Sequence, residues 1–202
     1  LCPRSKVPAL VEAIKAEVAR RYPTLKDNGD YTAIVSDRHH SRLAGLLSDA
    51  EEKGAEVIPI NPAGEDLSGG RRMAPTLVLN PTDEMVVMQE EIFGPILPIV
   101  ACEGVDAAVD YVNDRPRPLA LYYFDGSRRR ARAMLTRTIS GGVTINNTMF
   151  HIAQEDLPFG GVGPSGMGAY HGFEGFETFS HKKAVLRQSA LTLAPSLSLI
   201  HI

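Results

Sequence analysis

The stretch Met88–Pro98, with the sequence MQEEIFGPILP, leads from two adjacent acids through a Gly-Pro pair into an apolar run. Side chains alternate between the two faces of an extended segment. Glu91 and Phe93 are therefore predicted on one face, and Glu90 and Ile92 on the other. A carboxylate beside an aromatic ring suits a ligand that is part sugar and part flat ring. Two solvated acids and a packed Phe explain the same residues, and the stretch alone favours that plainer interpretation.

The apolar run is one of several strand-like segments that alternate with helix-like ones. Apolar residues at helical spacing predict helices over Lys6–Tyr22, Asp37–Lys53, Val105–Asn113, Ser127–Thr138 and Gly172–Phe179. Short apolar runs predict strands over Ala55–Ile60, Thr76–Leu79, Ile96–Ala101, Leu119–Phe124, Gly142–Asn146 and Ala184–Leu186. Ser36 is expected to cap the second helix, Gly54 to end it, and Asn61–Met73 to form a polar loop. This succession predicts an α/β fold with a doubly wound, mostly parallel sheet.

Composition restricts the class of protein. The 202 residues are 44% hydrophobic and 22% charged, which is typical of one globular domain or one domain with an appendage. A net charge of −3 gives no electrostatic basis for binding nucleic acid or an anionic membrane, and no apolar run is long enough to span one. The small number of cysteines does not make a disulfide framework. We therefore expect a cytoplasmic protein.

The cysteines and two of the histidines are weak candidates for chemistry. Arg4 lies near Cys2 in the sequence, but Pro3 and the chain end offer little scaffold for a reactive thiolate. Cys102 ends an apolar strand, where a buried packing role is expected. His39 and His40 are neighbours on a predicted helix, so their side chains point about 100° apart and cannot easily share a metal ion. No metal site is predicted.

A glycine-dense segment, Leu157–Gly168, follows the predicted strand Gly142–Asn146. Its Gly161-x-Gly163-x-x-Gly166 spacing matches a dinucleotide-binding fingerprint, but that fingerprint must follow a strand and open a helix. Pro164 interrupts it, so a structural turn is favoured. His151 and His171 flank the segment and are candidates for polar contacts in a pocket, although a structural role is favoured for each.

Three motifs together resemble the aldehyde dehydrogenase superfamily: Glu90–Pro95 (EEIFGP), Gly141–Asn146 (GGVTIN) and the glycine-dense segment. Their order and separation match as well. Further segments are similar to the class 3 branch, and within it to bacterial coniferyl-aldehyde dehydrogenases. These are Phe150–Gln154, Tyr170–Gly172 and Glu177–Ser180. The resemblance extends to about Arg187 and implies the fold of that family's catalytic domain.

The resemblance implies a reaction and roles for particular residues. In the family a cysteine thiolate adds to the aldehyde, the thiohemiacetal passes a hydride to NAD or NADP, and a glutamate activates the water that hydrolyses the thioester. Glu91 matches the acceptor for the nicotinamide ribose hydroxyls, and Phe93 the aromatic behind the nicotinamide ring. Asn146 matches the asparagine at a strand end beside the catalytic centre. Positions that line the aldehyde channel match Met149, Ile152, Phe159 and His171.

The resemblance also implies that the catalytic residues lie outside this chain. Leu1–Pro3 matches the end of the strand that follows the family's Gly-Gln-x-Cys nucleophile, which would lie roughly eight residues upstream, up to about 25 Å away. Cys2 is then a bystander, and the general-base glutamate also lies upstream. We therefore expect the carboxyl-terminal portion of an enzyme that is a homodimer when complete, inactive by itself.

The chain is predicted to divide into three parts. Residues 1–187 form part of the catalytic domain with the start of an association segment. Residues 188–196 form a tail, and residues 197–202 are a sequencing scar. A competing hypothesis is a non-catalytic α/β module that retains only the family's association surface, with the edge after Ala184 adding a strand to a partner. A free-standing dinucleotide-binding protein is a third, and depends on the glycine spacing rejected above.

Overall fold

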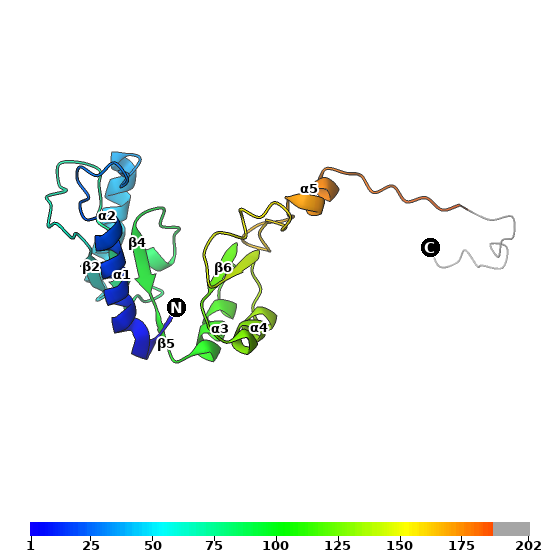
Figure 1. The fold of residues 1–202 in the computed structure, drawn as a ribbon, viewed down its shortest axis with the longest axis horizontal. Helices are drawn as coiled ribbons and strands as arrows, with labels where there is room; N and C mark the ends of the chain where they lie inside the picture. Colours follow the sequence, from blue (N-terminus) through cyan, green and yellow to red (C-terminus); the bar gives the residue numbers. More distant parts are fainter. Residues whose placement is uncertain (188–202) are drawn as a thin grey trace. The chain divides into compact units, whose positions relative to one another are not determined.

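The computed structural model describes residues 1–187, and the chain divides into two units, Leu1–Asp114 and a second that begins at Arg115 (Figure 1). The first unit contains β1 (Cys2–Pro3), η1 (Arg4–Lys6), α1 (Val7–Arg21), α2 (Asp37–Glu52), β2 (Glu56–Pro59), β3 (Thr76–Leu79), η2 (Val86–Met88), β4 (Ile96–Ile99), β5 (Ala101–Cys102) and α3 (Val105–Asn113). The second contains β6 (Ala120–Tyr123), α4 (Arg128–Arg137), β7 (Gly142–Ile145) and α5 (Gly172–Thr178). The predicted alternation of helices and strands is confirmed.

The strands pair mostly in parallel, as predicted. In the first unit the order is β2-β3-β4, with β2 antiparallel to β3 and β3 parallel to β4. β1 pairs in parallel with β5 in a separate ladder, and β6 pairs in parallel with β7 in the second unit.

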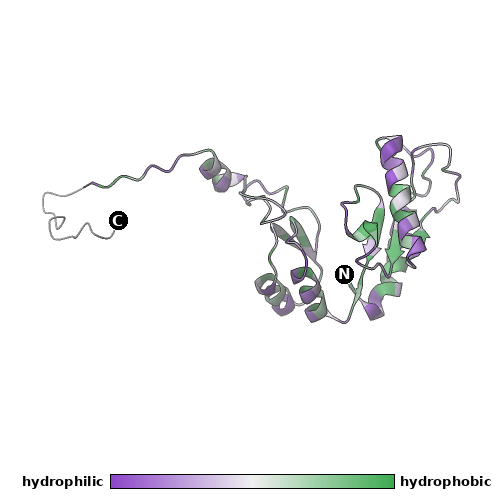
Figure 2. Cartoon of the chain, turned by 180° about the vertical axis from the view of Figure 1, so that it is seen from behind, coloured by the Kyte–Doolittle hydropathy of each residue, from purple (hydrophilic) through white to green (hydrophobic). Residues whose placement is uncertain are grey.

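Strand β3 is the centre of the first unit because both of its faces are covered. Val78 packs with Leu43 and Leu46 of α2, whereas its neighbour Leu77 packs with Val11 of α1 and with Ile99 of β4. Alternate residues of one strand thus belong to two apolar clusters, which is the arrangement of a doubly wound sheet. Figure 2 shows these strands as hydrophobic ribbons beside helices with one hydrophilic face.

Both ends of α2 follow from the sequence. The Ser36 hydroxyl accepts a hydrogen bond from the backbone N–H of His39 at 3.3 Å, which satisfies one of the free amides at the helix start. Gly54, with φ of 88°, follows the last helical turn in a left-handed conformation that glycine adopts without steric cost.

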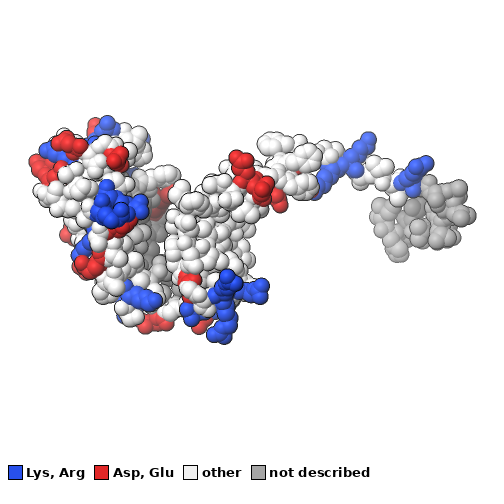
Figure 3. All heavy atoms as spheres, viewed as in Figure 1, with Lys and Arg blue, Asp and Glu red and all other residues white. Residues whose placement is uncertain are grey.

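In the second unit, α4 packs Ala131 and Met134 inward, and the Ser127 hydroxyl caps its first turn. Its arginines face solvent, and Figure 3 shows them as a basic patch over this helix. The glycine-dense segment turns back on itself through the bridges Phe159–Tyr170 and Gly163–Gly166, and no helix opens at Gly166. This geometry is that of a structural turn.

Several predictions were wrong in detail. The chain from Glu90 to Pro95 is not extended: Phe93 has φ of 46°, and the strand begins only at Ile96, so the predicted alternation of faces does not apply. Ala184–Leu186 forms no strand, because no neighbouring strand among residues 1–187 offers it a hydrogen-bonding edge. Cys102 is only partly buried, since β5 ends there and the chain turns away.

No helix within residues 1–187 is both long and apolar enough to cross a membrane. The predicted tail at 188–196 and the predicted scar at 197–202 lie outside the described residues.

Candidate functional site

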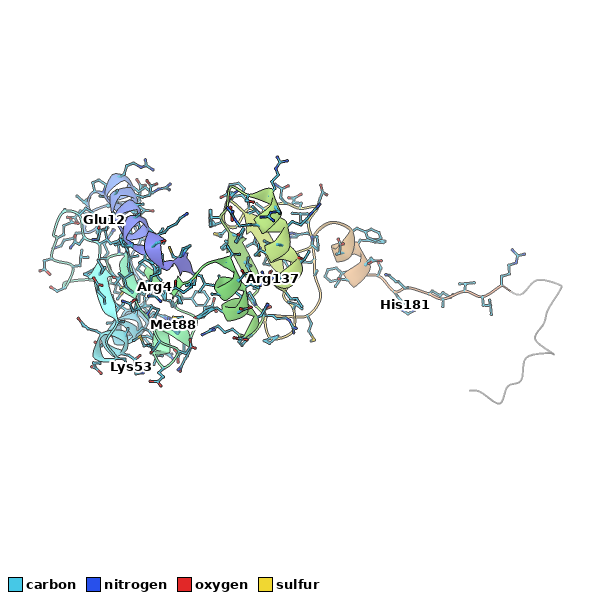
Figure 4. All side chains as sticks on the ribbon, turned by 90° about the horizontal axis from the view of Figure 1, so that it is seen from below. Arg4, Glu12, Lys53, Met88, Arg137 and His181 are labelled. Atoms are coloured by element: carbon cyan, nitrogen blue, oxygen red, sulfur yellow. The ribbon has the colours of Figure 1, made fainter. Side chains whose placement is uncertain are left out.

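The loop between η2 and β4 carries Glu91 and Phe93. Met88, the last residue of η2, marks its start and is labelled in Figure 4. The Phe93 side chain is a large apolar group left 77% exposed, and its backbone has φ of 46°. The Glu91 carboxylate is exposed too, and no hydrogen bond or ion pair within residues 1–187 engages it. An acceptor with free lone pairs and an uncovered ring therefore lie on one short loop, without the regular strand that sequence analysis predicted.

Asn146 lies at the carboxyl end of β7, with φ of 57°. Its Oδ1 accepts from the backbone N–H of Asp125 at 2.8 Å, and its Nδ2 donates to the carbonyl of the same residue at 3.1 Å. Asp125 follows β6, so the side chain of Asn146 joins the ends of two adjacent parallel strands. The carboxyl ends of parallel strands form the edge at which open α/β sheets bind ligands.

The Asp125 carboxylate is held in its charged form. Arg130 donates to both carboxylate oxygens at 2.6 Å, the backbone N–H of Ser127 donates at 2.8 Å, and the Tyr123 hydroxyl donates at 2.8 Å. These hydrogen bonds, with that of Arg130 the largest cause, hold the pKa of Asp125 far below its usual value. Asp125 therefore fixes the start of α4 and the loop that meets Asn146.

Phe159 and His171 are brought together by the glycine-dense segment. Their rings stack with centroids 6.1 Å apart and planes 27° apart, and Tyr170 packs edge-on against both. The backbones of Phe159 and Tyr170 exchange hydrogen bonds of 2.9 and 3.0 Å, which hold the two ends of the segment side by side. Of the predicted channel residues, these two form a direct pair.

His151 extends this group of rings inward. It is 7% exposed, its Nδ1 lies 2.8 Å from the Thr144 hydroxyl, and its ring lies 6.0 Å from that of Tyr122 and 6.1 Å from that of Phe159. A Cβ added to Gly142 would lie 2.6 Å from the ring, so this glycine in β7 provides the space that the ring fills. Its Nε2 is buried without a hydrogen-bond partner within residues 1–187, so His151 is not the fully satisfied structural histidine that the sequence favoured.

Met149 and Ile152 lie in the same turn as His151. The backbone N–H of Ile152 donates to the carbonyl of Met149 at 2.9 Å. The Met149 side chain is exposed, whereas that of Ile152 is half-buried. Met149 and Ile152 thus share one turn of the second unit.

Comparison with known proteins identifies the family to which this chain belongs. The sequence matches the Aldehyde dehydrogenase family over residues 1–185. The chain belongs to this family.

The similar aldehyde dehydrogenases include bacterial proteins with a named aldehyde. A probable coniferyl aldehyde dehydrogenase of Caulobacter vibrioides is 57% identical over 201 residues, which cover 98% of this chain and 41% of that protein. A coniferyl aldehyde dehydrogenase of a Pseudomonas species is 51% identical, over 94% of this chain and 40% of that protein. The chain thus spans about two fifths of the length of the curated relatives it matches.

Solved aldehyde dehydrogenases have the same fold. A substrate-bound Staphylococcus aureus AldH superposes with a TM-score of 0.80 at 36% identity, covering 95% of this chain and 41% of that one. A Mycobacterium tuberculosis aldehyde dehydrogenase complexed with NAD+ superposes with a TM-score of 0.78 at 26% identity, covering 95% and 40%. Each match covers nearly all of this chain, so the α/β architecture is that of part of an aldehyde dehydrogenase.

Sequence analysis missed the partners of several site residues. The position of Tyr122, in a predicted strand shortly before a polar turn, was only a weak indication that it contributes to the site. Asp125 and Thr144 carried none, since their contacts depend on how β6 and β7 pair. No group of three or more His, Cys, Asp or Glu side chains gathers within residues 1–187 in a way that would hold a metal ion.

Proposed function

We propose that this chain is the carboxyl-terminal part of an NAD(P)-dependent aldehyde dehydrogenase, and that the η2–β4 loop holds the nicotinamide-ribose end of the cofactor. The observation that carries the proposal is the pairing of an unengaged carboxylate with an uncovered ring at Glu91 and Phe93. A carboxylate accepts hydrogen bonds from vicinal hydroxyls, and an exposed Phe loses unfavourable contact with water when a flat ring covers it. The residues present thus fit that end of NAD or NADP.

The cofactor, when bound, supplies the acceptor for the hydride that leaves the aldehyde carbon. In this proposal Glu91 fixes the direction of the ribose and Phe93 limits the tilt of the ring. Asn146, Met149, Ile152, Phe159 and His171 are assigned to the aldehyde channel. The stacked pair of Phe159 and His171 gives the channel an aromatic wall, which suits a flat aldehyde such as coniferyl aldehyde.

The nucleophilic cysteine and the general-base glutamate are assigned to a segment that precedes Leu1. In support, the relatives are more than twice as long as this chain. The product is the carboxylic acid, formed through a cysteine thiohemiacetal, and the 202-residue chain alone is expected to turn over nothing. A relative is named as the dimeric NADP-preferring aldehyde dehydrogenase of Rattus norvegicus, and we extend the homodimer to the complete enzyme. A cytoplasmic location is proposed from cysteine usage alone.

A kinetic experiment on the complete enzyme, expressed from its full reading frame, tests the proposal. Reduction of NAD+ and of NADP+ is measured with coniferyl aldehyde as substrate. Glu91→Gln and Phe93→Leu are each expected to change the KM for the cofactor or kcat about tenfold or more, whereas the nearby exposed Glu84→Gln serves as the matched control. Wild-type kinetics for both variants would contradict the assignment.

A second candidate is a non-catalytic module that keeps the family's association surface. It is favoured by the exposed rings of Phe173, Phe176 and Phe179 on and just after α5. The reading frame upstream of Leu1 discriminates the two functions: a Gly-Gln-x-Cys sequence there supports the enzyme, and its absence supports the module. Reduction of NAD+ by the purified 202-residue chain would disprove its predicted inactivity.

A further inference from the structure

Arg42 of α2 reaches across to the loop that carries Glu91 and Phe93. Its Nη1 donates to the carbonyl of Glu91 at 3.3 Å, and its Nη2 donates to the carbonyl of Ile92. Nη1 also lies 3.9 Å from the Glu90 carboxylate. One guanidinium therefore meets the loop at three consecutive residues, which its planar fork of donors can do and a single ammonium cannot.

The next residue of α2 supports the same loop on the other side of Phe93. Leu43 is fully buried, and a Cβ added to Gly94 would lie 2.5 Å from both of its terminal methyl groups. Gly94 therefore lies directly against Leu43. Adjacent residues of one helix thus fix the backbone immediately before and immediately after Phe93.

The backbone of Phe93 needs such support. A φ of 46° is uncommon for a bulky residue, and such conformations persist only where their surroundings hold them. The Phe93 side chain cannot supply this, since it is largely exposed. The contacts on the two flanking segments are what hold this conformation. Before Phe93 the polar contacts are those of Arg42, and after it the carbonyls of Gly94 and Pro95 accept from the backbone N–H groups of Ile96 and Thr76 at 2.8 Å.

We propose that Arg42 is a positioning residue for the nicotinamide end of the cofactor. It does not contact the cofactor; it fixes the main chain from which Glu91 and Phe93 project, and so the directions of the carboxylate and the ring. This inference rests on the proposed function. The carbonyls that Arg42 contacts belong to exposed or half-exposed residues, so water replaces the guanidinium when it is removed. Removing Arg42 therefore changes the conformation of the loop more than the stability of the fold.

The experiment compares Arg42→Met and Arg42→Lys in the complete enzyme with Arg38→Met, an exposed arginine one turn earlier on the same helix. The KM for the cofactor and for coniferyl aldehyde, kcat, and the Kd of AMP are measured. AMP contains only the adenosine half of the cofactor, which Glu91 and Phe93 do not hold. Both Arg42 variants are expected to raise the cofactor KM about tenfold or lower kcat comparably, because small misplacements have large kinetic effects. The Kd of AMP and the parameters of Arg38→Met stay at wild-type values.

Three results would overturn the inference: unchanged cofactor KM and kcat in both Arg42 variants, an AMP affinity that falls in parallel with the cofactor affinity, or failure of both variants to fold. The last would make Arg42 a folding residue. Glu91→Gln and Phe93→Leu in the same assay separate this inference from the proposed function. If they alter cofactor kinetics and the Arg42 variants do not, only the inference fails; if they behave as wild type, the proposed function fails and the inference with it.

Discussion

The side-chain amide of Asn146 forms two hydrogen bonds with the backbone of Asp125: it accepts from the N–H of Asp125 and donates to the carbonyl of Asp125. The two residues follow β7 and β6, so this contact ties the carboxyl ends of two parallel strands together. Asn146, which is proposed for the aldehyde channel, therefore also links the two strands at that edge of the sheet.

Replacing Asn146 is expected to cost stability in two separable parts. Asn146→Ala removes two hydrogen bonds, worth about 1 kcal/mol each, and leaves a residue with a side chain at φ of 57°, which costs about 1–2 kcal/mol more. Asn146→Gly removes the same hydrogen bonds without that strain. Denaturant unfolding of the complete enzyme should place the Gly variant about 1–2 kcal/mol above the Ala variant. Equal values for the two would show that the left-handed backbone adds nothing.

Asp125 is expected to make stability depend on pH. Its pKa in the folded protein is lowered from 3.8 by the hydrogen bond from Arg130 and by those from Ser127 and Tyr123, so the unfolded chain takes up the proton first. The stabilisation is fully present above the unfolded pKa and is lost as pH falls from about 4 toward the lower folded pKa. In Asp125→Asn the midpoint of thermal unfolding should depend less on pH over this acidic range, with Asp114→Asn as an exposed comparison. An unchanged slope would contradict this.

The sequence predicted regular elements wherever the signals were local. β3 begins and ends at the predicted residues because a short apolar run there is bounded by residues that disfavour a strand, and α2 begins after Ser36 because the cap lies within its first turn. The run Ile96–Ala101 was predicted as one strand, but β4 and β5 pair with different neighbours, so it divides near Val100. Pairing partners distant in sequence are invisible to a pattern of apolar residues.

The residues of the candidate site were chosen from the sequence, which did not predict their geometry. Glu91 and Phe93 were selected as a pair from alternation in a strand, yet they lie on a loop whose conformation depends on Arg42, some fifty residues earlier. Nothing near Arg42 in the sequence signals that contact. The ring group around His151 was likewise not predictable, because it forms only when β6 and β7 pair and the glycine-dense segment folds back.

Gly142 and His151 offer a test of that packing. Gly142→Ala adds a methyl group 2.6 Å from the His151 ring, and overpacking of this kind costs about 1–3 kcal/mol. His151→Ala removes the ring, so the double variant should be less destabilised than the sum of the single ones by about 1 kcal/mol or more. The free energies of unfolding of the complete enzyme and the three variants measure this coupling. Simple additivity would mean that the two residues do not share the space.

The stacked rings of Phe159 and His171 should affect which aldehydes the enzyme prefers. Phe159→Leu keeps an apolar side chain but removes the ring, and aromatic pairs contribute about 0.5–1.5 kcal/mol beyond the area they bury. The kcat/KM for coniferyl aldehyde is therefore expected to fall about 2- to 12-fold more than that for hexanal. Phe150→Leu, which replaces an exposed ring nearby, is the matched control and should leave the ratio unchanged. If Phe159→Leu lowers kcat/KM equally for both aldehydes, the ring pair supports the fold of the glycine-dense segment without selecting the substrate.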